Sequence, residues 1–108
     1  MRKKITKKAR NYEEDLLESL KQPKEAIAYL NAHLEDEEKD AEELFLMALR
    51  DVARAHGFGE IASRADLGRE SLYKALSHEG NPRLTTLRSV LKALGLKLSV
   101  EPERKKAA

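Results

Sequence analysis

Several features that would assign this 108-residue chain to particular classes of protein are absent or scarce. It has no cysteine, which excludes a disulfide framework and a thiolate zinc site and is compatible with the reducing cytoplasm, where we expect it to act. Only 5 glycines and 3 prolines interrupt a composition that favours helix. No apolar run approaches the roughly 20 residues of a membrane span, and no signal-peptide-like stretch follows the basic N-terminus. We therefore expect no membrane partner.

The groups that would support catalysis or metal binding are not clustered. The three histidines, His33, His56 and His78, fall on different predicted elements without carboxylates at metal-ligand spacing. The chain has no glycine-rich phosphate loop and no Ser/His/Asp arrangement, and the acidic run 35–43 lacks the alternating ligands and the glycine of a calcium loop. We therefore expect a protein that is not an enzyme and has no catalytic residues, no metal and no cofactor.

The formal net charge is only +2, but the charges are segregated along the chain. Residues 1–10 carry six Lys and Arg and no acid, residues 11–56 carry five bases and thirteen acids, and residues 57–108 carry ten bases and six acids. The three segments thus amount to +6, −8 and +4. This asymmetry suits a protein that offers one surface to phosphate and another to a different partner. The alternative for the acidic segment is an ordinary solvated helix face.

Apolar spacing predicts an all-α fold of about five helices with an N-terminal helical extension. We expect helices at about 12–21, from Pro23 to Leu34, and at 41–56, 59–64, 69–76 and 84–94. A short β-strand should follow at 96–100, where apolar and polar residues alternate. The predicted divisions of the chain are a disordered basic tail (1–10), a helical extension (11–40), a helix-turn-helix domain (41–101) and a polar tail (102–108).

The segment 59–94 has the organisation of a DNA-binding helix-turn-helix unit. Its first two helices are separated only by residues 66–68, about the length of the turn in such motifs. Ala62 lies midway along the first helix, where a small side chain allows close approach, and Leu72, ten residues later, fills the contact from the second helix. An ordinary helical hairpin is the alternative, but the matching loop and helix that follow favour DNA binding.

The outward side chains of the second helix are the expected contacts with double-stranded DNA, because its first turn enters the major groove in this motif. Arg69 and Lys74 can reach guanine edges or phosphates, and Glu70 can accept a hydrogen bond from a cytosine amine. Tyr73 also faces outward, although half-buried packing is commoner for such a tyrosine than a base contact. The expected set is completed by candidate phosphate contacts and the loop that follows: Gly59, Ser71, Ser77, Asn81 and Arg83.

The string SLYKALSHEGNPRLTTLRSVLKALGLKL, residues 71–98, resembles the signature of addiction-module antidote proteins, the HigA-like antitoxins of the lambda-repressor-like helix-turn-helix group. ALRDVARAHG and AIAYLNAHLED also fit, so the resemblance covers about residues 12–101. It implies a five-helix domain that dimerises, binds a palindromic operator in its own promoter and neutralises a small toxin, RelE-like or of gyrase-inhibitor size, encoded next door. Asp66 stands where glycine is frequent, and the groove-facing residues here are Arg69 and Glu70, so no operator sequence carries over.

Two other functions stay open: a stand-alone transcriptional regulator of the same fold, and a helical protein-interaction module that has lost DNA binding. We expect a homodimer whose seam includes the strand at 96–100, because a lone strand leaves its backbone groups unpaired. A cognate toxin directed at RNA should be basic and should bind the acidic N-terminal half. Most apolar residues of that half should pack on the helix at 41–56, and the expected partner face lies beside Glu13, Glu14, Asp15 and Glu18.

Overall fold

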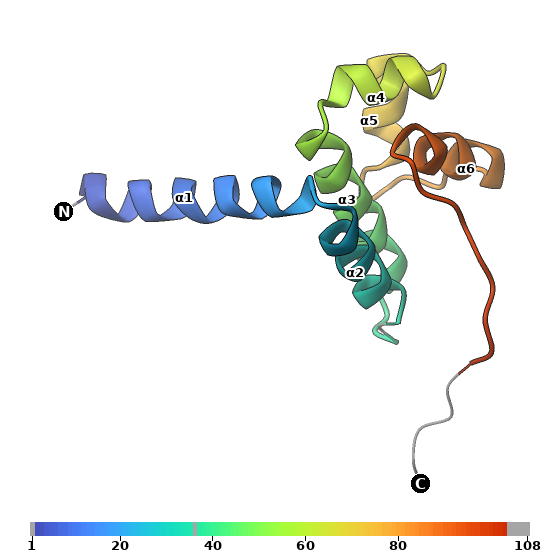
Figure 1. Ribbon diagram of the computed structural model, residues 1–108, viewed down its shortest axis with the longest axis horizontal. Helices are drawn as coiled ribbons and strands as arrows, with labels where there is room; N and C mark the ends of the chain where they lie inside the picture. The colour runs from blue at the N-terminus through green and yellow to red at the C-terminus, as the bar shows by residue number, and fades with distance from the viewer. Residues whose placement is uncertain (1, 36, 104–108) are drawn as a thin grey trace, which may run out of the picture.

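The chain folds around one central helix, as Figure 1 shows for the computed structural model, which describes residues 2–35 and 37–103 and, of these, the side chains from residue 11 onward. The described residues form six helices and no strand, which confirms the all-α class. In chain order the helices are α1 (Arg2–Leu20), α2 (Pro23–Leu34), α3 (Ala41–Ala55), α4 (Phe58–Arg64), α5 (Arg69–Ala75) and α6 (Leu84–Ala93).

Helix α3 lies at the centre of the fold, in keeping with its broadly apolar sequence. Its Leu49, Val52 and Ala53 are completely buried, and it packs against α1, α2 and α4. Because α4 in turn contacts α5 and α6, the apolar core is continuous from Leu20 at the end of α1 to Leu91 in α6. No polar or charged side chain among the described residues is buried in this core. Removal of apolar surface from water is therefore the main force that holds the helices together.

A set of polar contacts joins α1 and α2 to α3 at the edge of the core. The Tyr29 hydroxyl donates a hydrogen bond to Asp51 Oδ2 (3.0 Å), and Arg54 Nη1 lies 3.7 Å from Asp51 Oδ1. Arg54 Nη2 also donates to Glu13 Oε1 in α1 (3.1 Å). Partial burial, followed by the hydrogen bond to Asp51, raises the pKa of Tyr29 to about 12. The ion pairs of Arg54 are partly exposed and contribute about 1 kcal/mol each at most, so core packing dominates.

The boundaries of α3, α4, α5 and α6 fall within one residue of those predicted. These helices end where a local signal ends them. Gly57, at φ +97°, separates α3 from α4, and a residue with a β-carbon is strained in that conformation. After α6, Gly95 adopts φ +80°, its N–H donates to Lys92 O (2.9 Å), and the Leu96 N–H donates to Leu91 O (2.7 Å). This pair of hydrogen bonds is the Schellman cap that ends many helices.

The strand predicted at 96–100 is not present, and this prediction is wrong for the single chain. Residues 96–100 are described but have no regular secondary structure. A strand needs a neighbouring strand for its backbone hydrogen bonds, and the described residues supply none. Leu96 is half-buried against the core, whereas Leu98 and Val100 are exposed. The alternation of apolar and polar residues therefore marks an extended segment without a partner in this chain.

The first helix is longer than its sequence pattern predicted. Helix α1 begins at Arg2 and not near Tyr12, so residues 2–10, which we expected to be a disordered tail, continue the helix. The prediction relied on apolar spacing, which this segment lacks, whereas the Lys, Arg and Ala that make up most of it have high helix propensity. Figure 1 shows this part of α1 standing away from the other helices.

The described residues contain neither a membrane-spanning helix nor a metal-binding cluster. None of their helices combines the length and apolarity needed to cross a bilayer. No three of their His, Cys, Asp and Glu side chains form a group that could hold a metal ion. Acidic residues around the connection between α2 and α3 instead line an open groove.

Candidate nucleic-acid interface

The turn between α4 and α5 is closed by a left-handed cap. Asp66 follows α4 at φ +58°, and no other non-glycine residue in the described part of the chain has a positive φ. Its N–H donates to Ser63 O (3.1 Å), and the Leu67 N–H donates to Ala62 O (2.9 Å). Aspartate tolerates this conformation because its short polar side chain can form local hydrogen bonds. The chain therefore leaves α4 and enters α5 through only the four residues 65–68.

Small and apolar side chains hold α5 against α4. Ala62 is 2% exposed and Leu72 is fully buried, as their spacing in the sequence predicted. Ile61 and Leu76 are buried as well, and the two helices are in contact. A helix of seven residues has little stability of its own, so this burial is what keeps α5 in place. The opposite face of α5 is then left for solvent or a ligand.

The outward face of α5 carries the side chains that the sequence predicted. Arg69, Glu70, Ser71 and Lys74 are exposed, and Tyr73 is half-exposed. They come together because α5 is a regular helix anchored at Leu72, so one side of it faces the core and the other faces outward. This cluster is the largest part of the predicted DNA-binding set that the fold gathers on one element.

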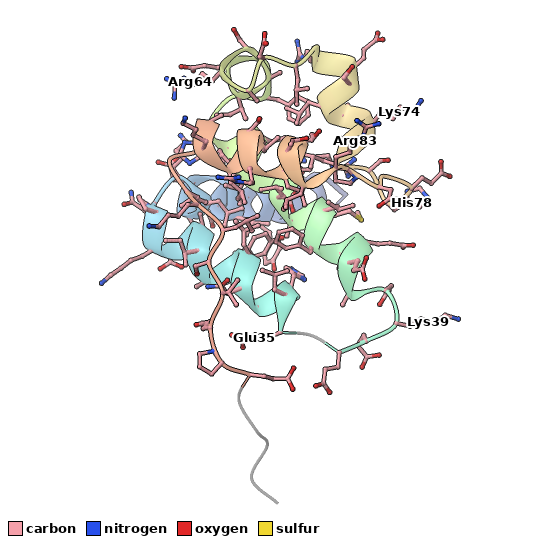
Figure 2. The ribbon with its side chains drawn as sticks, turned by 90° about the vertical axis from the view of Figure 1, so that its right-hand side faces the viewer. Glu35, Lys39, Arg64, Lys74, His78 and Arg83 are labelled. Carbon is pink, nitrogen blue, oxygen red and sulfur yellow. The ribbon has the colours of Figure 1, made fainter. Side chains whose placement is uncertain are left out.

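The remaining predicted residues lie on adjoining segments. Gly59, at the start of α4, and Arg69 border the same shallow depression of about 490 Å³, so they belong to one surface. Ser77 is partly buried, and its hydroxyl donates to Lys74 O (2.9 Å) at the end of α5. Asn81 lines a different groove, away from Arg69, and Arg83 is exposed just before α6. Figure 2 labels both Lys74 and Arg83.

Tyr73 is held by a stack of side chains that sequence reasoning missed. Its ring centroid lies 4.8 Å from that of Phe58, and the Arg50 guanidinium carbon lies 5.6 Å from the Tyr73 centroid. Tyr73 thus packs on Phe58 and Arg50 while it stays 49% exposed. Arg50 comes from α3, and its buried Nε has no hydrogen-bond partner among the described residues. The sequence signal for this contact was a lone arginine within the apolar run of α3. Such an arginine needs a partner for its charge, and the face of an aromatic ring is a favourable one.

The surface formed by α4, the turn, α5 and Arg83 carries a net charge of only +1. Arg64 forms an ion pair with Glu60 one turn earlier (2.6 Å), so these two charges cancel. Arg69, Lys74 and Arg83 are exposed and form no ion pair with a described carboxylate, and two exposed acids stand beside them, Asp66 in the turn and Glu70 on α5. Cations on an exposed helix can bind phosphate and base edges, and Glu70 can accept from a base amine.

Comparison with known proteins places most of the chain in one family. A family model described as "Probable addiction module antidote protein" matches residues 11–102, which include α2 to α6 and the second half of α1. An uncharacterized protein of Haemophilus influenzae is 44% identical over 90 residues, which are 83% of this chain and 90% of that protein. No solved structure matches the chain. The chain therefore belongs to the family of probable addiction module antidote proteins.

Proposed function

We propose that this protein is the antitoxin of a toxin–antitoxin module, a HigA-like member of the lambda-repressor-like helix-turn-helix proteins. It acts in the cytoplasm as a homodimer that represses its own promoter and neutralises a RelE-like toxin encoded beside it. The family match over residues 11–102 supports the antitoxin role. The observation that carries DNA binding is the exposed, cation-bearing face of α5 opposite a completely buried Leu72. In this role α4, the turn and α5 form the helix-turn-helix.

The chemistry of repression follows from the placement of α5. Its first turn enters the major groove, where Arg69 contacts a guanine edge and Lys74 contacts a base or a phosphate. The stack of Arg50, Tyr73 and Phe58 restrains the middle of α5 and so reduces the side-chain freedom lost on binding. Because every lysine or arginine that neutralises a phosphate releases a counterion, affinity for DNA falls steeply as salt rises.

Dimerisation gives the unpaired segment 96–100 a partner. Two copies related by a two-fold axis can pair these segments as antiparallel strands, which satisfies backbone groups that one chain leaves free. Such a dimer reads a palindrome when its two α5 helices lie about 34 Å apart, one turn of DNA. Truncation after Gly95 should therefore convert a dimer into a monomer in sedimentation velocity. A truncated chain that remains a stable dimer would place the seam elsewhere.

The test of DNA binding is a gel shift with the intergenic DNA upstream of the gene. Arg69→Ala should weaken binding by about 1–3 kcal/mol and relax sequence preference, if Arg69 makes a bidentate base contact. Lys92→Ala, which removes an exposed cation from α6 outside the predicted set, is the matched control and should have a much smaller effect. Unchanged binding after combined loss of Arg69 and Lys74 would show that α5 is not the reading helix.

The test of the antitoxin role uses the product of the neighbouring reading frame. Its expression alone should arrest growth, and coexpression of this protein should restore growth. A neighbouring product that is harmless, with DNA binding intact, would favour a stand-alone transcriptional regulator. Absence of DNA binding with a bound neighbouring product would instead favour a protein-interaction module that has lost the DNA function.

A further inference from the structure

An open groove of about 1140 Å³ lies between the N-terminal and C-terminal parts of the fold. The end of α2, the α2–α3 connection and the first half of α3 form one side of it. The loop between α5 and α6, the start of α6 and the extended segment after it form the other side. Figure 2 labels one lining residue from each side, Lys39 and His78. The outward face of α5 does not line the groove.

Apolar side chains line the floor and sides of this groove. Three of the eight exposed large apolar residues in the described chain meet here. They are Leu34 (56% exposed), Leu84 (63%) and Leu98 (42%). Below them Phe45 and Leu46 are buried. Past Leu34 and Leu98 the apolar surface continues to Ile27, which is 45% exposed. A gathering of exposed apolar side chains framed by polar residues is characteristic of a protein-interaction site.

The rim of the groove is acidic. Five carboxylates against one lysine leave it at −4 with the two lining histidines neutral, and the five are Glu37, Glu38, Glu42, Glu43 and Glu79. This concentration of negative charge lies around apolar surface, so it favours a partner that carries Lys and Arg beside its own apolar anchors. Basic groups of that partner would meet the rim while its apolar side chains cover Leu34, Leu84 and Leu98.

We propose that this groove is the docking site for a basic, apolar-anchored segment of the cognate toxin. The inference rests on the proposed antitoxin function and adds the surface and the chemistry of the contact. It also revises the expectation that the acids of α1 bind the toxin. On α1, Glu13 is engaged by Arg54, Leu20 is buried and Leu16 packs on the core, so only Tyr12 remains as an exposed large apolar residue in its described side chains.

Charge argues against a second copy of this chain in the groove. A two-fold interface brings the same surface of each copy together, so two acidic rims would face each other. Like charges set together at an interface are strongly unfavourable, whereas a basic partner gains both attraction and faster association. The groove and the proposed dimer seam are therefore assigned to different partners, although Leu98 belongs to the segment that contributes to both.

The experiment measures binding of the purified neighbouring gene product to the full chain by biolayer interferometry. The double variant Leu34→Gln/Leu84→Gln should weaken binding by about tenfold or more, as expected when apolar anchors at the centre of an interface are lost. Glu42→Gln/Glu43→Gln should slow association by about three- to tenfold at low salt, and the difference should shrink at high salt.

Matched controls make changes of the same kind on α1, apolar to polar and acid to amide, at residues that are all exposed. Tyr12→Gln removes an exposed large apolar side chain, and Glu14→Gln/Asp15→Asn removes two exposed carboxylates. Both controls should bind within about twofold of the wild-type chain, because residues outside the centre of an interface contribute little. Thermal melts of all variants establish that each is folded.

Four outcomes distinguish the groove from the other possible sites and partners. Weakened binding by both groove variants, with intact binding by the α1 controls, supports the groove. Failure of the wild-type chain to bind the neighbouring product overturns the antitoxin function itself. Intact binding by the groove variants and loss in the α1 controls overturns the groove and returns the toxin site to α1. Loss of self-association by Leu34→Gln/Leu84→Gln in sedimentation, with full toxin affinity, would show that a second copy fills the groove.

Discussion

Replacing Gly80 with alanine should destabilise the protein through a steric collision alone. A β-carbon at Gly80 would lie 2.2 Å from Ala75 O, 2.8 Å from Ala75 C and 2.9 Å from Lys74 O. Gly80 is not among the glycines with a positive φ, so its own backbone conformation would accept alanine. The atoms in the way belong to the backbone at the end of α5, which cannot rotate aside as a side chain can. The loop, or the end of α5, must therefore move.

The magnitude follows from the packing around this loop. The Gly80 N–H donates to Ser77 O (2.8 Å), and the adjoining Leu76 is fully buried, so the loop has little room to shift. Forced backbone movements of this kind cost about 1–3 kcal/mol. For a domain of this size each 1 kcal/mol lowers Tm by about 4–8 °C, so Gly80→Ala should lower Tm by about 5–20 °C. Thermal and urea denaturation followed by circular dichroism measure both quantities.

Gly59→Ala is the matched control for this prediction. A β-carbon at Gly59 meets nothing within 4 Å, and the residue lies in the first turn of α4. Alanine is favoured over glycine within a helix by up to about 1 kcal/mol, so this variant should be unchanged or slightly more stable. An unchanged urea midpoint for Gly80→Ala, or equal losses in the two variants, would refute the steric argument.

Two further predictions concern the anchor of α5 and the pH dependence of folding. Leu72→Ala should lower the free energy of unfolding by about 2–5 kcal/mol, because Leu72 is fully buried, whereas Leu84→Ala, at a 63% exposed position, should stay within about 0.5 kcal/mol in the same urea titration. Equal losses would show that Leu72 does not anchor the helix. The pKa of Tyr29 rises from 10.0 to about 12 on folding, so the folded state holds this proton more tightly. The resulting stability is complete below pH 10 and is lost as pH rises from 10 towards 12, and Tyr29→Phe should remove this part of the decline in urea midpoint. Parallel declines in both proteins would contradict the assignment.

The helices and turns from α3 onward could be predicted because the signals that start and end them are local. Glycine at 57 and 95 suits the left-handed caps found there, and the three residues 66–68 allow only a short turn. The periodicity of apolar residues identified the face of α5 that packs on α4, so the exposed Arg69, Glu70 and Lys74 followed from the position of Leu72. These predictions depend only on residues that lie within a few helical turns of one another in the sequence.

The first helix and the C-terminal segment were mispredicted for a related reason. Apolar spacing reports a helix only where the helix packs on something, and residues 2–10 lack such spacing although α1 runs through them. Alternating residues at 96–100 satisfy a strand pattern, but pairing depends on a second strand that this chain does not provide. In both segments the local sequence favours one conformation, but whether the segment packs or pairs depends on residues outside it.

The sequence alone determined the fold class, the order of helices and the outward face of α5, since these depend on periodicity and on caps a few residues apart. Only the tertiary structure decided which apolar side chains remain uncovered. Leu34 and Leu84 have the helical spacing of core residues and Leu98 follows the alternation at 96–100, but the helices and loop that meet around them leave an open groove. The contact of Arg50 with the Tyr73 ring also depends on the tertiary structure, because it joins α3 to α5. Periodicity identifies an apolar face, whereas its burial depends on segments far away in the chain that pack against it.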